Sequence, residues 1–407
     1  MAAVAVKFRM EFDKQMSGVQ AATHASAATM EQFRGAALKA GKDTQFSATQ
    51  AAQGIEELAK AGVSSADILG GGLKGALDLA AAGGLEVGEA AETAASALTQ
   101  FKLNGKDVPH VADLLAAAAG KAQGSVHDMG QALNQTGLIA SQTGLTIEET
   151  TGGLAAFASA GLIGSDAGTS FKQMLLMLQA PSGKTKDLMD DLGISAYDTQ
   201  GNFIGLTALA GQLKDRLSSL TPEVRANAMA QIFGADATRA ASILYTEGSA
   251  GIQEWIDKTN HAGYAAETAA IKTDNLAGDL ERLKGSLETA AIESGGGLSE
   301  GLRVLAQGAD AAVGALSKLP SGVTATITVA AALGGALTLG LVAWAKTRAA
   351  IASVIVELNA AGPAGARAAT GLAAANKAAG RAALAFAGLQ AAALVFDQFG
   401  NLSLIHI

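Results

Sequence analysis

The residues that could carry chemistry in this chain lie in short glycine-rich motifs, scattered histidines and acidic pairs. Gly70, Gly72 and Gly75 satisfy the spacing GxGxxG of a dinucleotide-binding turn. That turn needs a strand before it and a helix after it, within a parallel βαβ unit. Here the residues before the first glycine, Ser65 to Leu69, form a capped helix start. We therefore interpret these glycines as part of loose helix packing.

A second motif resembles the end of a phosphate-binding loop. Gly183-Lys184-Thr185 matches the last three residues of that loop, but the first glycine would fall at Leu178. No strand is predicted before it, so the sequence predicts no phosphate site here.

The other ionisable residues form no catalytic or metal-binding pattern. No histidine belongs to a compact ligand pair such as HExxH, and the chain contains no GxSxG nucleophile turn. It also contains no Cys, which excludes disulfides and thiolate chemistry. Acidic pairs at helix starts or on polar faces are predicted to be solvated charges, so we predict no enzyme, cofactor or metal site. The histidines are His24, His110, His127, His261 and His406, and the acidic pairs are Glu56-Glu57, Glu148-Glu149 and Asp190-Asp191.

The composition predicts a helical protein of more than one domain. The chain has 407 residues, with 50 Gly but only 5 Pro, and it is rich in Ala. This balance favours closely packed helices with frequent breaks. Aromatic residues, at 4%, are too few for a typical large hydrophobic core. The formal charge of −8 without a basic tract argues against sequence-specific nucleic-acid binding.

One helix–turn–helix device recurs from Phe46 to about Gly193. In Gly62-Val63-Ser64 and Gly144-Leu145-Thr146, a glycine ends one helix and a hydroxyl residue begins the next. Glycine accepts the left-handed conformation at a helix end, and Ser or Thr caps the free amides that follow. The pattern predicts helical hairpins with short turns.

The stretch after these hairpins carries one strand signal and several helix signals. Tyr197–Ile204, with Gly201-Asn202 at its centre, predicts a small β-hairpin. Thr221-Pro222 begins a helix that we expect to reach about Phe233, followed by helices at 236–245 and 250–262. The leucines at 276, 280, 283 and 287 then have heptad spacing, which favours either an amphipathic packing helix or a coiled coil.

These signals divide the chain into segments. The fold class we predict is all-α, with helical hairpins, a bundle and one small β-hairpin, followed by long helices that include one apolar helix. Residues 402–407 resemble the translation of a sequencing adaptor, so we interpret the chain as a C-terminally truncated fragment. The alternative is an ordinary apolar C-terminus. The segments are a helical lead-in (1–45), a core of helical hairpins (46–265), amphipathic, coiled-coil-like helices (266–319), an apolar helix (320–345), Ala-rich helices (346–401) and a non-native tail (402–407).

The apolar helix has the length of a membrane span. Val323 to Ala345 is free of charge, and about 23 helical residues cover about 35 Å against a hydrocarbon core of about 30 Å. Ala332, Ala336 and Gly340 form a small-residue stripe, and Trp344 stands where an interfacial aromatic is expected. Four threonines make insertion marginal, so the alternative is a fully buried helix.

Several stretches, taken in order over about residues 45–300, resemble the core domain of phage tail tape measure proteins. The quoted stretches are Phe46–Ala52, Leu58–Ser64, Val111–Leu115, Gly161–Ser170, Leu192–Ile194 with Asp198 and Gly201, Ile232–Gly234 with Ala240–Leu244, and Asn275–Ser286. The positions carried over as structural family-motif residues are Gly62, Asp113, Gly164, Ala167, Gly168, Thr169, Gly193, Gly201, Phe233 and Gly234.

The resemblance implies a structural role in the virion. A tape measure occupies the lumen of the growing tail tube, and its extended length limits the length of the tail. It leaves the tube ahead of the DNA and can enter the host membrane. The implied partners are the tail tube protein, tail assembly chaperones, baseplate and distal tail proteins, further copies in the lumen, and the host membrane after ejection. The implied locations are the tail lumen, the host cytoplasm during assembly and the host membrane on infection.

A second class of function competes with this one. The apolar helix at 320–345 would also suit a membrane-inserting or pore-forming effector of a phage-derived particle. The neighbouring genes would discriminate, because tail-tube and chaperone genes beside this one favour the tape measure.

Overall fold

The computed structural model describes residues 2–294, which belong to one compact unit. Within this range the regular secondary structure is helical, which confirms the predicted all-α class. The apolar segment with Val323, Ala332, Ala336, Gly340 and Trp344 lies outside the described residues, as do the other segments predicted after residue 294. In residues 2–294 no helix combines the length and the apolar character that crossing a membrane requires. The predicted boundaries at residues 45 and 265 stay predictions.

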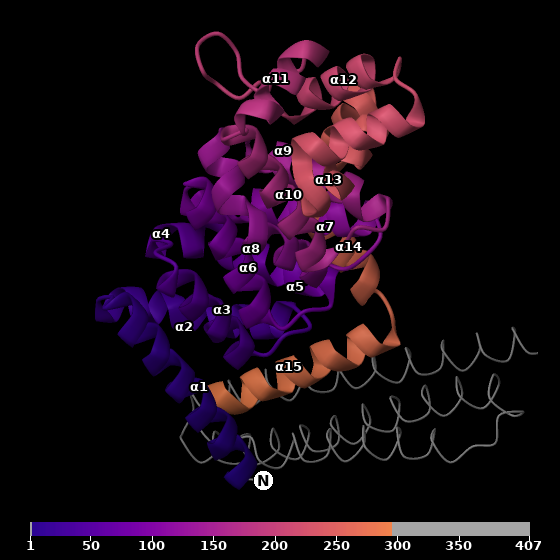
Figure 1. The fold of residues 1–407 in the computed structure, drawn as a ribbon. Coiled ribbons are helices and arrows are strands. Elements are labelled where there is room, and N and C mark those ends of the chain that lie inside the picture. The colour runs from indigo at the N-terminus through magenta and orange to yellow at the C-terminus, as the bar shows by residue number, and fades with distance from the viewer. Residues whose placement is uncertain (1, 295–407) are drawn as a thin grey trace, which may run out of the picture. The chain divides into compact units, whose positions relative to one another are not determined.

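The helices stack as two parallel layers. In the first layer α1 (Ala2–Thr23), α3 (Ala48–Lys60), α6 (Val87–Phe101), α8 (Val126–Thr143) and α10 (Gly164–Gln179) each pack on the next. In the second layer α5 (Leu73–Gly83), α7 (Val108–Lys121), α9 (Ile147–Ser159) and α13 (Pro222–Thr259) do the same. Figure 1 shows the progression from indigo α3 through α6 and α8 to α10.

The stack has a regular period. The N-cap residues of the first-layer helices are Ser47, Glu86, Ser125 and Ile163, which lie 39, 39 and 38 residues apart. Each repeat is therefore a helical hairpin, and each hairpin buries its apolar face against its neighbours, as in α-solenoids. The hairpins predicted from the capping device are confirmed, but their period was not recognised in the sequence.

Local capping explains where these helices begin and end. Ser64, Ser125 and Thr146 each accept a hydrogen bond from the amide three residues on. Gly62 and Gly144 take positive φ angles of 84° and 98°, which fit the left-handed turn expected at a helix end. The caps and the glycine turns each depend on residues close in sequence, so they could be predicted without knowledge of the fold.

Shorter elements complete the first half of the stack. α2 (Ala27–Asp43) packs on α3. A short helix α4 (Ser65–Asp67) and a π-helical turn (Ile68–Gly72) connect α3 to α5, and a 3₁₀ turn (Gly105–Asp107) connects α6 to α7. After α10 the chain continues through α11 (Gly183–Leu192) and α12 (Leu206–Leu217) into α13.

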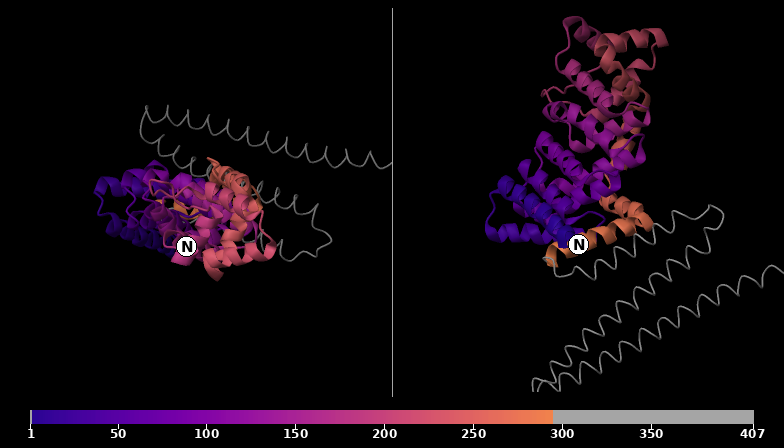
Figure 2. Two further views of the ribbon diagram at one scale, coloured as in Figure 1. Left: turned by 45° about the horizontal axis from the view of Figure 1, so that its top comes forward. Right: turned by 90° about the horizontal axis from the view of Figure 1, so that it is seen from below.

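The last two described helices return to the beginning of the stack. α14 (Tyr264–Thr273) packs on α5 and α7, and α15 (Leu276–Ser294) packs on α1 and α2. The right view of Figure 2 shows the orange helix α15 beside the indigo N-terminal helices. The described chain therefore closes on itself, and a Lys42–Glu293 ion pair of 2.6 Å is one of the contacts at the closure.

The predicted β-hairpin is wrong as a pair of strands. The structure has a single antiparallel bridge between Tyr197 and Phe203 at this place. The Asp198 carboxylate accepts the amides of Gln200 and Asn202 at 2.9 and 2.8 Å, and so closes the loop locally. Strands cannot extend further because α12 begins at Leu206.

Three helices predicted after Thr221 form one helical run with two breaks. Gly234 and Gly248 have φ angles of 72° and 66° inside α13, near the predicted ends at Phe233 and Tyr245. Glycine tolerates these angles without the steric cost that a Cβ would add. The predicted breaks are therefore confirmed, although the pieces follow one another without a loop.

The core is built largely from alanine and aliphatic side chains. It runs without interruption from α1 to α15, and alanines fill many of its fully buried positions. Within residues 2–294 a few phenylalanine side chains are fully enclosed, which matches the low aromatic content. They are Phe12, Phe33, Phe157, Phe171 and Phe233.

Candidate functional site

The Gly164–Ser170 motif lies at the contact between α8 and α10. Ala167 and Gly168 are buried, Thr169 is half-buried, and Gly164 begins the helix with a φ angle of 60°. A Cβ at Gly168 would collide with the backbone carbonyl of Ala132 on α8. Glycine at this position therefore allows the two helices to approach closely.

The same motif also supports the break in α13. The Ser170 hydroxyl, fully buried, donates to the carbonyl oxygen of Asp236 at 2.6 Å and accepts from the amide of Ala240 at 3.2 Å. A hydroxyl inserted between residues four apart satisfies backbone groups that a distorted helix leaves unpaired. Phe233 and Gly234 lie just before Asp236 on the same helix, so the structure brings two predicted motif stretches together. Ser170 belonged to a quoted stretch but was not chosen as a site residue.

Asp113 joins two segments that are far apart in sequence. Its carboxylate on α7 accepts the amides of Gly263 at 2.7 Å and Ala265 at 2.9 Å. These amides are at the beginning of α14, where unpaired donors and the helix dipole favour a carboxylate. The carboxylate therefore fixes the point at which the returning part of the chain meets the stack.

Replacing Asp113 with alanine is expected to lower the free energy of unfolding by about 1–2 kcal/mol, the usual cost of losing an N-cap. Urea unfolding of the whole chain followed by far-UV circular dichroism would measure it. Glu254→Ala is the control, because Glu254 is exposed near the C-terminal end of α13, far from a helix N-terminus, and forms an ion pair with Lys258 at 2.6 Å. Equal destabilisation by both variants would contradict the capping role of Asp113.

The remaining motif glycines lie elsewhere and serve turns. Gly193 ends α11 with a φ angle of 67°, and Gly201 has a φ angle of 84° in the loop closed by Asp198. Gly62 is in the turn after α3. The predicted motif residues therefore lie in different parts of the fold, and their assignment as family-motif residues stays a prediction.

The two glycine-rich motifs of the sequence lie in helices and helical turns. Gly71 has a φ angle of 144° in the π-helical turn, and a Cβ at Gly75 would lie 2.9 Å from the Cα atom of Pro109 on α7. Lys184 and Thr185 are in the first turn of α11, where the Ser182 side chain accepts the Thr185 amide. Neither segment follows a strand, as a nucleotide-binding loop would require.

Two histidine–carboxylate pairs connect successive hairpins. His110 on α7 bonds Glu148 on α9 at 2.7 Å, and His127 on α8 bonds Glu89 on α6 at 2.5 Å. Both pairs join residues 38 apart, which is the period of the stack. The prediction that Glu148 is a solvated charge is therefore wrong, because stacking places α7 beside α9. Its neighbour Glu149 accepts the amides of Thr146 and Leu206.

The first pair has perturbed acid–base properties. The hydrogen bond from His110 lowers the pKa of Glu148 to about 2, and the hydrogen bond to Glu148 raises the pKa of His110 above its usual value. Each side chain thus stabilises the charged form of the other. Such a pair strengthens the contact between α7 and α9 over a limited range of pH.

This pair is expected to stabilise the fold most between about pH 4.5 and 6.5, where Glu148 is ionised and His110 protonated also in the unfolded chain. The contribution is lost as the pH rises through the raised pKa of His110, and as it falls toward the lowered pKa of Glu148. Urea midpoints measured from pH 4 to 9 should therefore decline more steeply above pH 6.5 than those of His110→Gln. Parallel curves for the two proteins would contradict the assignment.

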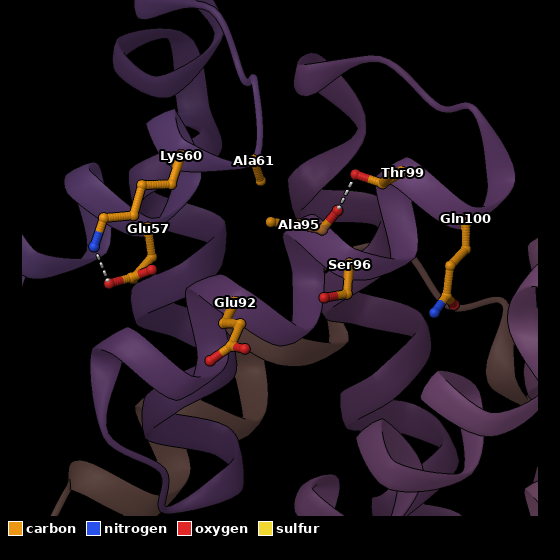
Figure 3. A pocket seen from close by; sticks show the side chains of 8 residues that line it. All are labelled: Glu57, Lys60, Ala61, Glu92, Ala95, Ser96, Thr99 and Gln100. Atoms are coloured by element: carbon orange, nitrogen blue, oxygen red, sulfur yellow. Dashed lines mark hydrogen bonds and ion pairs between the residues drawn. The ribbon is translucent and has the colours of Figure 1, made fainter. Parts of the chain in front are cut away.

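Figure 3 shows a surface hollow between α3 and α6. It has a volume of about 350 Å³ and is lined by Glu57, Lys60, Ala61, Glu92, Ala95, Ser96, Thr99 and Gln100. The Lys60 ammonium group is held by Glu56 at 2.7 Å and Glu57 at 3.0 Å, and the Thr99 hydroxyl donates to a backbone carbonyl. The Lys60 ammonium group is thus neutralised by two carboxylates, and the Thr99 hydroxyl is used by the backbone, so neither of these two groups is a nucleophile paired with a base.

The chain is similar to known phage tail proteins. Residues 34–234 match the family described as phage-related minor tail protein. The chain is 36% identical over 296 residues to the tape measure protein of Pneumococcus phage Dp-1, covering 72% of this chain and 25% of that protein. It is 31% identical over 354 residues to the probable tape measure protein of Escherichia phage P2, covering 82% of this chain and 43% of that protein. No solved structure matches the chain.

The stacked helices belong to a protein of the phage-related minor tail class. The chain is a member of the phage tail tape measure protein family, which confirms the resemblance found in the sequence. It spans about a quarter of one of these relatives and less than half of the other.

Proposed function

We propose that this chain is part of a tape measure whose own length sets the length of a phage tail. The observation that carries this proposal is the identity with two proteins named as tape measures, which extends over 72% and 82% of the chain. The described fold is compatible, because the motif positions within residues 2–294 serve helix packing, capping and turns. In this view residues 2–294 form a folded part, and the length-determining part follows it.

The proposal is tested by changing the length of the gene product in a phage that carries it. Deleting residues 350–380 leaves the folded part untouched and removes 31 residues. At 1.5 Å per helical residue, tails seen by electron microscopy should shorten by about 47 Å. Replacing the same residues with an unrelated helical sequence of equal length is the control and should leave the tail length unchanged. Tails of unchanged length after the deletion would contradict the proposal.

The partners in this proposal are those of tail assembly. They are the tail tube protein that polymerises around the tape, assembly chaperones, baseplate and distal tail proteins, and further copies of this chain in the lumen. Support comes from the family assignment alone. Affinity purification of the tagged chain from infected cells should recover the tube protein. Absence of the tagged chain from assembling tails would contradict this part of the proposal.

Ejection ahead of the DNA and entry into the host membrane extend the proposal. Support comes from the sequence of Val323–Ala345, which is free of charge and of spanning length. A lysine at the centre of a span costs about 2.5–3.5 kcal/mol, so Leu333→Lys should abolish flotation of the whole chain with lipid vesicles. Leu302→Lys, outside the segment, should have no such effect. Equal flotation of both variants would contradict insertion through this segment.

A further inference from the structure

The connection between α6 and α7 contains an asparagine that is followed by a glycine. Asn104-Gly105 is the one Asn-Gly pair in the sequence. Asn104 is exposed and precedes the 3₁₀ turn, with φ and ψ angles of −89° and 159°. Asparagine is a chemically labile residue, because its side-chain amide can react with the next backbone nitrogen. A following glycine favours this reaction, since it has no Cβ to crowd the nitrogen.

Packing requires the glycine at this place. A Cβ at Gly105 would lie 2.6 Å from Cγ1 of Val63 and 2.8 Å from Cβ of Asp67. Both residues belong to the connection between α3 and α5, so the α6–α7 connection rests closely on the first hairpin. The glycine that this contact demands also makes the residue before it reactive.

The backbone nitrogen of Gly105 is available for the reaction. Within residues 2–294 its N–H group donates no hydrogen bond, whereas the groups beside it are held. The Asn104 amide donates to the Asp107 carboxylate at 2.9 Å, and the Asn104 carbonyl oxygen accepts from the Asp107 amide at 2.9 Å. Rotation about the Cα–C bond of Asn104 brings the Gly105 nitrogen to the side chain and opens the second of these bonds. A single hydrogen bond in an exposed turn is a small obstacle to that rotation.

We propose that Asn104 is a site of spontaneous deamidation in the folded chain. The Gly105 nitrogen gives its proton to solvent and attacks the side-chain carbon Cγ of Asn104. The bond from Cγ to Nδ2 breaks, and the leaving group takes up a proton and departs as ammonia. Water then opens the resulting five-membered succinimide at one of its two carbonyl carbons, which leaves aspartate or isoaspartate at position 104. The reaction consumes one water and releases one ammonia, with no change in oxidation state.

The reaction changes the contact between the first two hairpins. Both products place a carboxylate at position 104, next to a glycine on which Asp67 already lies and in a turn that holds the Asp107 carboxylate. Isoaspartate also inserts a methylene group into the backbone. The bonds with Asp107 and the close contact of Gly105 with Val63 then cannot all be kept. We therefore expect the folded unit to become less stable as isoaspartate accumulates.

Peptide mapping by mass spectrometry tests the site in the whole folded chain, kept at mildly alkaline pH for increasing times. Asn202 is a matched internal control, because it is also exposed in a loop and its amide donates to the Asp198 carboxylate at 2.8 Å. It differs from Asn104 in that Phe203 follows it. We expect aspartate and isoaspartate to appear several-fold faster at position 104 than at position 202.

Urea unfolding followed by far-UV circular dichroism tests the consequence. The aged parent chain should unfold at a lower urea concentration than the fresh parent chain. Asn104→Gln is the control variant, because it keeps a neutral amide but would have to close a larger ring. Its aged and fresh samples should unfold at the same urea concentration.

Three results would overturn the proposal. One is equal conversion at Asn104 and Asn202 in the folded chain. Another is conversion at Asn104 only after unfolding in urea, which indicates that the turn protects the residue. The third is an aged parent chain that contains isoaspartate but keeps its urea midpoint, which refutes the predicted weakening. None of these results changes the tail-length experiment, so the two proposals fail separately.

Discussion

Phe233→Ala is expected to lower the free energy of unfolding by about 3–5 kcal/mol, the usual range for truncating a buried phenylalanine. The side chain of Phe233 is 1% exposed, on α13 directly before the glycine break. Its removal leaves a cavity where α13 packs on α10, and the neighbouring Ser170 bonds limit how far the helices can collapse into it.

Urea unfolding of the whole chain, followed by far-UV circular dichroism, would measure this loss of stability. Val224→Ala on the same helix is the control, because Val224 is 51% exposed and its truncation should change stability by less than about 0.5 kcal/mol. A loss below about 1 kcal/mol for Phe233→Ala would show that this contact does not carry core packing.

Gly168→Ala is expected to destabilise the fold by about 1–3 kcal/mol, although alanine is the better helix former. The added methyl group would meet the Ala132 carbonyl oxygen and the Gln135 side chain on α8. Because a carbonyl group in a helix cannot move alone, α8 and α10 must separate, and the packing on both sides of the contact is weakened.

Gly35→Ala is the matched control with the opposite sign. Gly35 lies inside α2 with open space around it, so alanine should stabilise the helix there by about 0.5–1 kcal/mol. Thermal melts of the two variants should therefore move in opposite directions from the parent. A stabilising effect of Gly168→Ala would mean that α8 and α10 are not in close contact in solution.

Local signals in the sequence predicted the helices well. The caps at Ser64, Ser125 and Thr146 and the glycines at 62 and 144 act within a few residues, so their outcome does not depend on the fold. The breaks of α13 were found for the same reason. The 39-residue period was missed because the hairpins do not repeat an amino-acid sequence. They share only the positions of helix caps and small residues.

Contacts between distant residues could not be predicted in this way. Nothing beside Asp113 indicates that it caps a helix beginning 150 residues later. The His110–Glu148 pair exists only because the stack places α7 next to α9. The heptad-spaced leucines of α15 at 276, 280, 283 and 287 were recognised as a stripe, but periodicity alone cannot tell which stripe of a helix faces the core. Here Gly285 lies against the backbone of α2 and of the segment before α3.

The return of α14 and α15 to the first helices determines how the described unit responds to pulling force. The first and last described helices, α1 and α15, pack on each other, so tension applied at Ala2 and Ser294 loads that contact before any hairpin of the stack. α15 would peel away first, followed by α14 with its Asp113 cap. The hairpins, each held mainly by its neighbours, would then yield one after another.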